Sequence, residues 1–294
     1  MALYISYTHL YPLLYETYSN ILVQKSLHDD PDIQHMPLFC FDERMRNDIW
    51  STYHGRNMAL DALGKAVLPY QHWYFYPVMG FARVNLHIQS IIYLIQTFPL
   101  HGDAMQNKGY EKILDEKTGN IKDKYAWPRP TLGIWTASVA GIAFYTILFS
   151  KFLSMLGLYS GLVSFSVIYL TSGILHVQIL LSHVAMDYCI TGHGRDELHD
   201  NTSISYYEWQ ALSTMDVECP PWFDWFHGGL QFQLEHHLFP RVPRKNLRRL
   251  MKLTDQIFHK YNVPVIRRGF YESNKMILKH MATVGANVVK SKYA

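Results

Sequence analysis

The sequence has few of the features that would stabilise a disulfide-rich protein or bind nucleic acid. Its three cysteines, Cys40, Cys189 and Cys219, show no C-x-x-C spacing, which excludes a disulfide framework or a zinc ribbon and fits a reducing compartment. The formal net charge of +3 is too small to indicate a nucleic-acid partner. Residues 1–27 lack the basic start and the small-residue cleavage site of a signal peptide.

Charged residues are also missing from one long part of the chain. Residues 131–150 carry no charge, and residues 152–186 contain no Asp, Glu, Lys or Arg. Because about 20 apolar helical residues cross the hydrocarbon core of a membrane, the pattern predicts two spans, at 131–150 and 159–182, joined by a short turn. Two buried helices of a soluble protein are the alternative, but such helices normally show a polar stripe.

The basic residues around this hairpin predict its orientation. Lys122, Lys124 and Arg129 precede the first span, and a basic cluster at 241–252 follows the second, whereas Lys151 alone lies in the turn. Basic residues favour the cytosolic side of a membrane. We therefore expect both outer ends of the hairpin in the cytosol.

Two shorter apolar stretches precede the hairpin. Residues 70–82 and 86–98 are interrupted by proline, glycine and arginine, so they predict interfacial or partly inserted helices, although one further span stays open. Residues 102–130 are polar and predict a cytosolic loop. The expected fold is all-α, with multi-pass membrane helices, one clear hairpin and a cytosolic helical cap.

Histidine is unusually frequent, with 16 residues, and position must decide which of them matter. In the segment QFQLEHHLFP, residues 231–240, Gln233, His236 and His237 stand at i, i+3 and i+4 and would share one helix face. Imidazole is a suitable ligand for iron. The pattern predicts a metal site on this helix, and a solvated polar face is the alternative.

His183 is a second candidate ligand, at the cytosolic end of the second predicted span. It follows His176 by seven residues, so the two lie roughly on one helical face. An ionisable residue near the end of a membrane helix that faces the bundle is a functional candidate. Alternatively, His183 marks only the membrane boundary.

Basic and aromatic residues surround the histidine segment. The aromatic residues predict either the lining of an apolar tunnel or an anchor at the membrane interface, and they are Trp222, Phe223, Trp225 and Phe226. The basic residues predict contact with anionic lipid headgroups or with an acidic electron donor, and they are chiefly Arg241, Arg244, Lys245 and Arg248. A solvated helix face that fixes topology is the alternative for the basic residues.

These motifs resemble those of a known family. Residues 224–250, DWFHGGLQFQLEHHLFPRVPRKNLRRL, resemble the third histidine box of front-end membrane desaturases, in which glutamine replaces the first histidine, as Gln233 does here. Residues 30–39, DPDIQHMPLF, resemble the segment after the second box of that family. The combination STMDVECPPWFDWFHGGLQFQ, residues 213–233, is most similar to fungal and plant sphingolipid 8-desaturases. The resemblance covers residues 28–260.

The resemblance implies a chemistry and a location. It implies a lipid desaturase with two irons, which introduces a double bond at the 8-position of the sphingoid base and takes electrons from a cytochrome b type donor. It implies an endoplasmic reticulum membrane protein with its histidine box facing the cytosol, and a ceramide or acyl-chain substrate. It carries His183, His236 and His237 over as iron ligands and Gln233 as an outer or water-mediated partner. A fatty acyl desaturase of the 5- or 6-position and a non-catalytic lipid-binding or desaturase-associated fragment are the alternatives.

The chain departs from the family in its histidine boxes. The H-x-x-x-H and H-x-x-H-H boxes and the haem motif H-P-G-G are absent from the sequence. We therefore expect a non-family segment at 1–27, the C-terminal part of a desaturase domain at 28–260, and a polar, basic tail at 261–294. The few remaining donors predict a polypeptide that binds iron weakly and does not desaturate lipid by itself.

Overall fold

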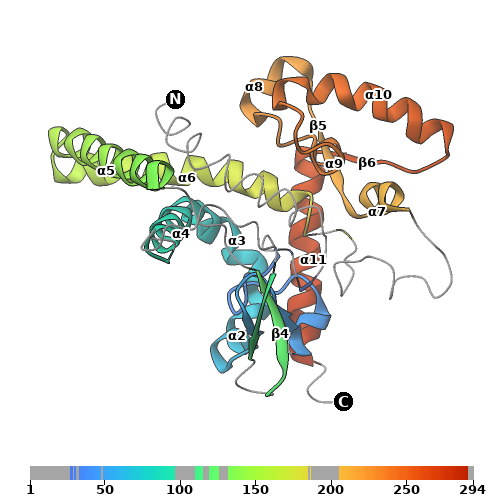
Figure 1. Ribbon diagram of the computed structural model, residues 1–294, viewed down its shortest axis with the longest axis horizontal. Helices are drawn as coiled ribbons and strands as arrows, with labels where there is room; N and C mark the ends of the chain where they lie inside the picture. The colour runs from blue at the N-terminus through green and yellow to red at the C-terminus, as the bar shows by residue number, and fades with distance from the viewer. Residues whose placement is uncertain are drawn as a thin grey trace. The chain divides into compact units, whose positions relative to one another are not determined.

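The computed structural model is mostly helical (Figure 1). The predicted segment 1–27 lies outside the described residues except for Leu27. The chain forms two compact units. Unit 1 comprises Met1–Tyr18, Tyr76–Lys112 and Tyr125–His176, and unit 2 comprises Ser19–Phe75, Ile113–Lys124 and Val177–Ala294. The structure describes residues 27–28, 30, 33–47, 49–96, 110–114, 119–125, 132–184, 186 and 205–290.

The two long apolar helices predicted from the sequence are confirmed. Helix α5 (Leu132–Met155) and helix α6 (Leu158–Leu181) are separated by a turn in which Gly157 has a φ of 75°. Both are long and apolar enough to cross a membrane, and only 6% and 19% of their most apolar windows are buried. That low burial argues against core helices of a soluble protein, because core helices bury their apolar surface. It fits the predicted membrane hairpin.

Close packing in unit 1 joins α6 to the end of α3 (Gln71–Gly80). A Cβ on Gly173 of α6 would lie 2.7 Å from the Cα of Gly80. Small residues at such crossings let two helix backbones approach, which is typical of membrane helices. Helix α4 (Ala82–Gln96) packs on α5 in the same unit, where Trp135 Nε1 donates a hydrogen bond to Leu94 O at 2.8 Å. The predicted helices around 70–82 and 86–98 are thus present.

Unit 2 has an aromatic core near its N-terminal part. Phe39 stacks on Phe41 at 5.9 Å and on Tyr74 at 5.4 Å. The side chain of Gln71 crosslinks distant segments, because its Nε2 donates to Cys40 O at 2.9 Å and to Met281 O at 2.8 Å. The short elements around this core are η1 (Glu43–Asn47), β1 (Ile49–Ser51), β2 (Arg56–Met58), α2 (Ala62–Val67) and η2 (Leu68–Tyr70).

The prediction of a helical fold is confirmed in its main feature, and the described residues also contain short strands that it did not include. The described part of the chain contains three two-stranded sheets, namely β1–β2, β3–β4 (Tyr110–Leu114 and Ile121–Tyr125) and β5–β6. Strands β5 (Met215–Glu218) and β6 (Ile266–Gly269) pair in parallel, with Met215 opposite Ile266. Strands β5 and β6 have four residues each, and their pairing joins segments that are far apart in the chain. Local apolar periodicity does not reveal such pairing.

The region after residue 260 contains a helix that was not predicted, because the composition of residues 261–294 is polar. Helix α11 (Phe270–Lys290) follows β6, and it buries Ile277, Met281, Val284 and Val288. These residues recur every three or four positions, which places them on one face of a helix. The description of residues 261–294 as a polar, basic tail therefore missed an amphipathic helix of the unit 2 core.

The remaining elements of unit 2 carry the predicted site. Figure 1 shows them as the orange elements of the chain. They are α7 (Tyr206–Ser213), η3 (Pro221–Phe223), α8 (Asp224–His227), α9 (Gln233–Leu238), η4 (Arg244–Asn246) and α10 (Leu247–Lys260).

Candidate histidine site

The segment QLEHHL forms helix α9, as its spacing predicts. Gln233 is 4% exposed, Glu235 0% and His237 2%, and His236 is partly buried. A solvated polar face would leave these side chains in water. The burial therefore excludes that alternative and requires a structural or chemical reason for each polar group.

His183 comes close to this helix. It lies just after the end of α6, is 1% exposed, and its ring centroid is 5.3 Å from that of His237. The rings of His236 and His237 are 6.1 Å apart. All three predicted ligands thus gather within unit 2. Gln233 lies in the first turn of the same helix, and its role as an outer partner stays a prediction.

Side-chain oxygens hold two of the rings in a defined orientation. His183 Nδ1 lies 3.1 Å from Asp30 Oδ2, and His237 Nδ1 lies 3.0 Å from Gln210 Oε1. A carboxylate or amide oxygen only accepts, so Nδ1 carries the proton in both rings. The nitrogen with the lone pair is then Nε2, the atom through which either ring would bind a metal.

Asp30 and Gln210 are residues to which the sequence analysis assigned no role. Asp30 is 0% exposed and Gln210 is 1% exposed. Asp30 stands in the quoted DPDIQ segment, but nothing in that pattern shows that it meets a histidine more than a hundred residues later. Only folding brings the two together.

The donor set fits a metal in kind but not in number. Imidazoles with outer oxygen partners are typical metal-site chemistry. Within the described ranges, however, no group of three or more His, Cys, Asp or Glu side chains is placed so as to hold a metal ion. The described residues thus offer imidazole donors without a complete metal site.

Another buried histidine of unit 2, His227, is held by a glutamine of α6. His227 of α8 is 2% exposed, and its Nδ1 donates to Gln178 Oε1 at 2.7 Å. Gln178 lies on α6, just over one turn before His183. The ring of His227 also meets the edges of Phe223 and Phe226, at 5.1 and 5.3 Å. Burial lowers the pKa of His227, which keeps this ring neutral.

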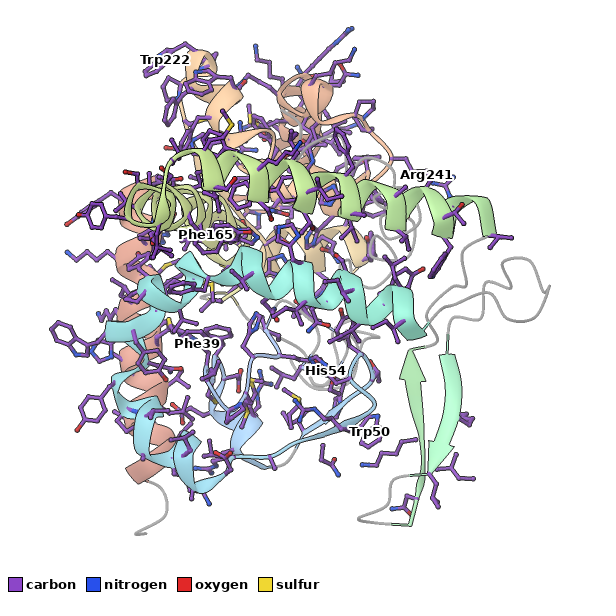
Figure 2. All side chains as sticks on the ribbon, turned by 90° about the vertical axis from the view of Figure 1, so that its left-hand side faces the viewer. Phe39, Trp50, His54, Phe165, Trp222 and Arg241 are labelled. Carbon is purple, nitrogen blue, oxygen red and sulfur yellow. The ribbon has the colours of Figure 1, made fainter. Side chains whose placement is uncertain are left out.

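The aromatic residues before α9 differ in exposure. Trp222 and Trp225 are 73% and 75% exposed, and Figure 2 shows Trp222 directed away from the ribbon. Phe223 and Phe226 are partly buried and stack on each other at 4.7 Å. The two pairs therefore have different surroundings, which their shared aromatic character did not predict.

The basic cluster also divides. Arg241 and Lys245 are exposed, and Arg244 is partly buried. Arg248 instead forms an ion pair with Asp224 and donates to Cys219 O at 3.0 Å. The guanidinium lowers the pKa of Asp224. Arg248 thus links α10 to α8, and its predicted contact with headgroups or a donor protein is the least supported of the four.

A network of buried charge lies beneath α9. Asp216 of β5 is 2% exposed, and its Oδ1 accepts a hydrogen bond from Leu234 N at 2.9 Å. Glu235 accepts from Thr254 Oγ1 at 2.8 Å. Burial and the neighbouring Glu235 raise the pKa of Asp216 well above its usual range, so the two carboxyl groups retain a proton between them.

Arg267 of β6 supplies the positive charge of this network. Its Nε lies 3.6 Å from Asp216 Oδ2, and its guanidinium binds Asp255 of α10 at 2.5 and 3.0 Å. Its Nη2, which binds Asp255, also lies 3.9 Å from Glu235 Oε1. The network ties α9 to α10 and to the β5–β6 pair. It explains why the histidine segment contains a buried glutamate.

His236 should give stability a measurable pH dependence. Burial, with the positive charge of Arg244 and the nearby His183, lowers its pKa to about 4. The unfolded chain binds this proton near pH 6.5, so stability is complete above that pH and falls as pH drops toward 4. In the metal-free protein, we expect His236→Asn to reduce this pH-dependent change in the free energy of unfolding by about 1–2 kcal/mol. Denaturant titrations across this pH range measure it.

The matched control is His259→Asn, which alters an exposed histidine of α10. This variant should show the same dependence of unfolding free energy on pH as the unsubstituted chain. An unchanged slope in His236→Asn would show that another group is responsible.

The fold and the site together define a class of protein, namely a membrane-associated helical protein with a buried cluster of histidines. Comparison with known proteins identifies the family. The family model for fatty acid desaturases matches residues 26–269, and the chain belongs to that family. The resemblance predicted from the histidine box is confirmed.

Three relatives show which desaturases the chain is similar to. It is 33% identical over 259 residues to a Delta(8)-fatty-acid desaturase of Helianthus annuus, covering 88% of this chain and 48% of the relative. It is 34% identical over 262 residues to a Delta 8-(E)-sphingolipid desaturase of Komagataella phaffii, covering 88% and 42%. It is 29% identical over 255 residues to an acyl-lipid (9-3)-desaturase of Borago officinalis, covering 86% and 48%. The chain thus spans less than half the length of these relatives. No solved structure matches the chain.

Proposed function

We propose that this chain carries one wall of the iron site of a membrane lipid desaturase that acts at the 8-position of the sphingoid long-chain base. The observation that carries this proposal is the pairing of His183 with His237, with Nδ1 of both rings held by buried oxygen acceptors. The fatty acid desaturase family and the Delta 8-(E)-sphingolipid relative support the reaction and the substrate.

The residues of this chain would hold and orient metal. His183, His236 and His237 would bind iron, and Gln233 would contact it through water. When bound, two irons with molecular oxygen supply the oxidant that an unactivated methylene chain requires. Asp30 and Gln210 keep two of the rings in the tautomer that binds metal. The H-x-x-x-H and H-x-x-H-H spacings are absent from the sequence, so most of the family's donors are not encoded in this chain.

The membrane setting is part of the proposal. Helices α5 and α6 would span the endoplasmic reticulum membrane, with the histidine site on the cytosolic side. A cytochrome b type protein would supply electrons, and exposed Arg241 and Lys245, with Arg244, are the candidate contacts for it or for the lipid headgroup. The high exposure of Trp222 and Trp225 favours an interface anchor, whereas Phe223 and Phe226 stay candidates for the tunnel wall.

Iron retention and product formation test the chemistry. We expect the purified chain to hold iron far below two equivalents and to form no desaturated lipid, because its donors are too few. His237→Ala should remove most of the retained iron, and His259→Ala, which alters an exposed histidine, should not. Two firmly bound irons with turnover would overturn the prediction of an inactive chain.

A chimera distinguishes the substrate alternatives. Residues 26–269 of this chain would replace the matching region of the Komagataella phaffii relative, and lipid profiling would locate the new double bond. A bond in the long-chain base is expected. A new double bond only in fatty acyl chains would favour the alternative of a fatty acyl desaturase of the 5- or 6-position. A stable chimera without product would favour a non-catalytic, lipid-binding chain.

A further inference from the structure

Helix α10 presents a second apolar stripe that the fold of unit 2 does not use. Its inner face buries Leu247, Thr254 and Phe258, and Phe258 packs with Leu234 of α9. On the outside, Leu253 is 52% exposed, Ile257 55% and Tyr261, directly after the helix, 67%. These three stand at i, i+4 and i+8, so they form one row along the helix. We call this row with its flanking cations the outer face of α10.

The flanks of this row are basic. Arg249, Lys252 and Lys260 are exposed beside it. The one acidic residue of α10, Asp255, is held by Arg267 from the inner side. The outer face therefore combines apolar side chains with positive charge and offers no acidic side chain of its own helix.

This combination fits an anionic lipid surface. Helices that lie in the membrane interface place apolar side chains at the level of the acyl boundary, while lysine and arginine reach up to the phosphates. Juxtamembrane cations are each attracted to an anionic leaflet. The same unit exposes Trp222 and Trp225, whose amphipathic rings favour the interface between water and lipid. An acidic protein would pair with the cations but would leave the row of three apolar side chains unexplained.

We propose that α10 binds in the plane of an anionic membrane surface through Leu253, Ile257 and Tyr261, with Arg249, Lys252 and Lys260 on the headgroups. This surface differs from the basic cluster named earlier, in which Arg241, Arg244 and Lys245 precede α10 and Arg248, near the start of the helix, is paired with Asp224 inside unit 2. The proposal involves no metal ion and no desaturase chemistry, so it stands or falls separately from the proposed function.

The test uses the whole chain in lipid nanodiscs, with an environment-sensitive fluorophore on Ile257→Cys in a background where Cys189 and Cys219 are serine. One set of discs contains phosphatidylcholine alone, and the other also contains phosphatidylserine. We expect blue-shifted emission and quenching by spin-labelled lipid in the discs with phosphatidylserine. Leu253→Cys serves as a second labelling site and keeps the test decisive if the first variant misfolds.

Charge variants provide the matched comparison. Arg249→Gln, Lys252→Gln and Lys260→Gln together should abolish most of the quenching, because each cation contributes about 5-fold to partitioning onto an anionic surface. Arg268→Gln removes a cation from β6, where it pairs with Glu272, and should leave the quenching unchanged. Thermal unfolding confirms that each variant is folded.

Two results would overturn the proposal. One is emission typical of water in both kinds of disc at both labelled positions. The other is protection of the label only when an acidic electron-donor protein is added, which would make the outer face a protein-docking surface.

Discussion

Arg267→Ala should lower the free energy of unfolding by about 3 kcal/mol, because it removes the positive charge from a buried carboxyl pair. Asp216 and Glu235 are 2% and 0% exposed and cannot turn toward water. Proton uptake by the pair limits the loss, since burial already raises the pKa of Asp216. Denaturant titration of the purified chain in detergent measures the change.

The pH dependence identifies the cause. Without Arg267 the folded-state pKa of the carboxyl pair rises further, so the folded chain binds more protons than the unfolded chain as pH increases above about 4. The loss of stability should therefore be larger at alkaline than at mildly acidic pH. A loss that does not change with pH would mean that Arg267 acts by packing alone.

The neighbouring residue is the control for this prediction. Arg268→Ala removes the same side chain one position later, where it forms an exposed i, i+4 pair with Glu272. Exposed pairs contribute about 0.5 kcal/mol. Similar losses in both variants would contradict the assignment of a buried network at Arg267.

Gly285→Ala should destabilise unit 2 by about 2 kcal/mol, against the usual effect of this change in a helix. Alanine is favoured over glycine in helices by about 1 kcal/mol. At Gly285 of α11, however, a Cβ would overlap the backbone carbonyl oxygen of Leu68 and lie 3.3 Å from Gln71 Nε2. Overpacking against backbone costs about 1–3 kcal/mol or more, so we expect the clash to exceed the gain in propensity.

Thr283→Ala separates the two effects. Thr283 is exposed on the same helix, so its change to alanine also raises helix propensity without new contacts. We expect it to be neutral or slightly stabilising in thermal unfolding. If Gly285→Ala is equally neutral, α11 does not pack against η2 as closely as the structure indicates.

The sequence predicted those elements whose pattern lies within a short stretch of the chain. The charge-free runs predicted α5 and α6 because apolar length is a local property. The spacing of Gln233, His236 and His237 predicted α9 for the same reason. Helix α11 was missed although its buried residues have helical spacing, because the polar residues between them dominated the composition.

By itself the sequence determined the family, since a histidine segment of this pattern with its flanks resembles that of desaturases, and the family match confirms the resemblance. It also determined the apolar hairpin. Tertiary structure alone decided that Asp30 holds His183, that Gln210 holds His237, and that Arg248 and Arg267 serve the fold. These partners are far apart along the chain. Their contacts depend on which distant segments the fold brings together, and no local pattern of residues specifies that arrangement.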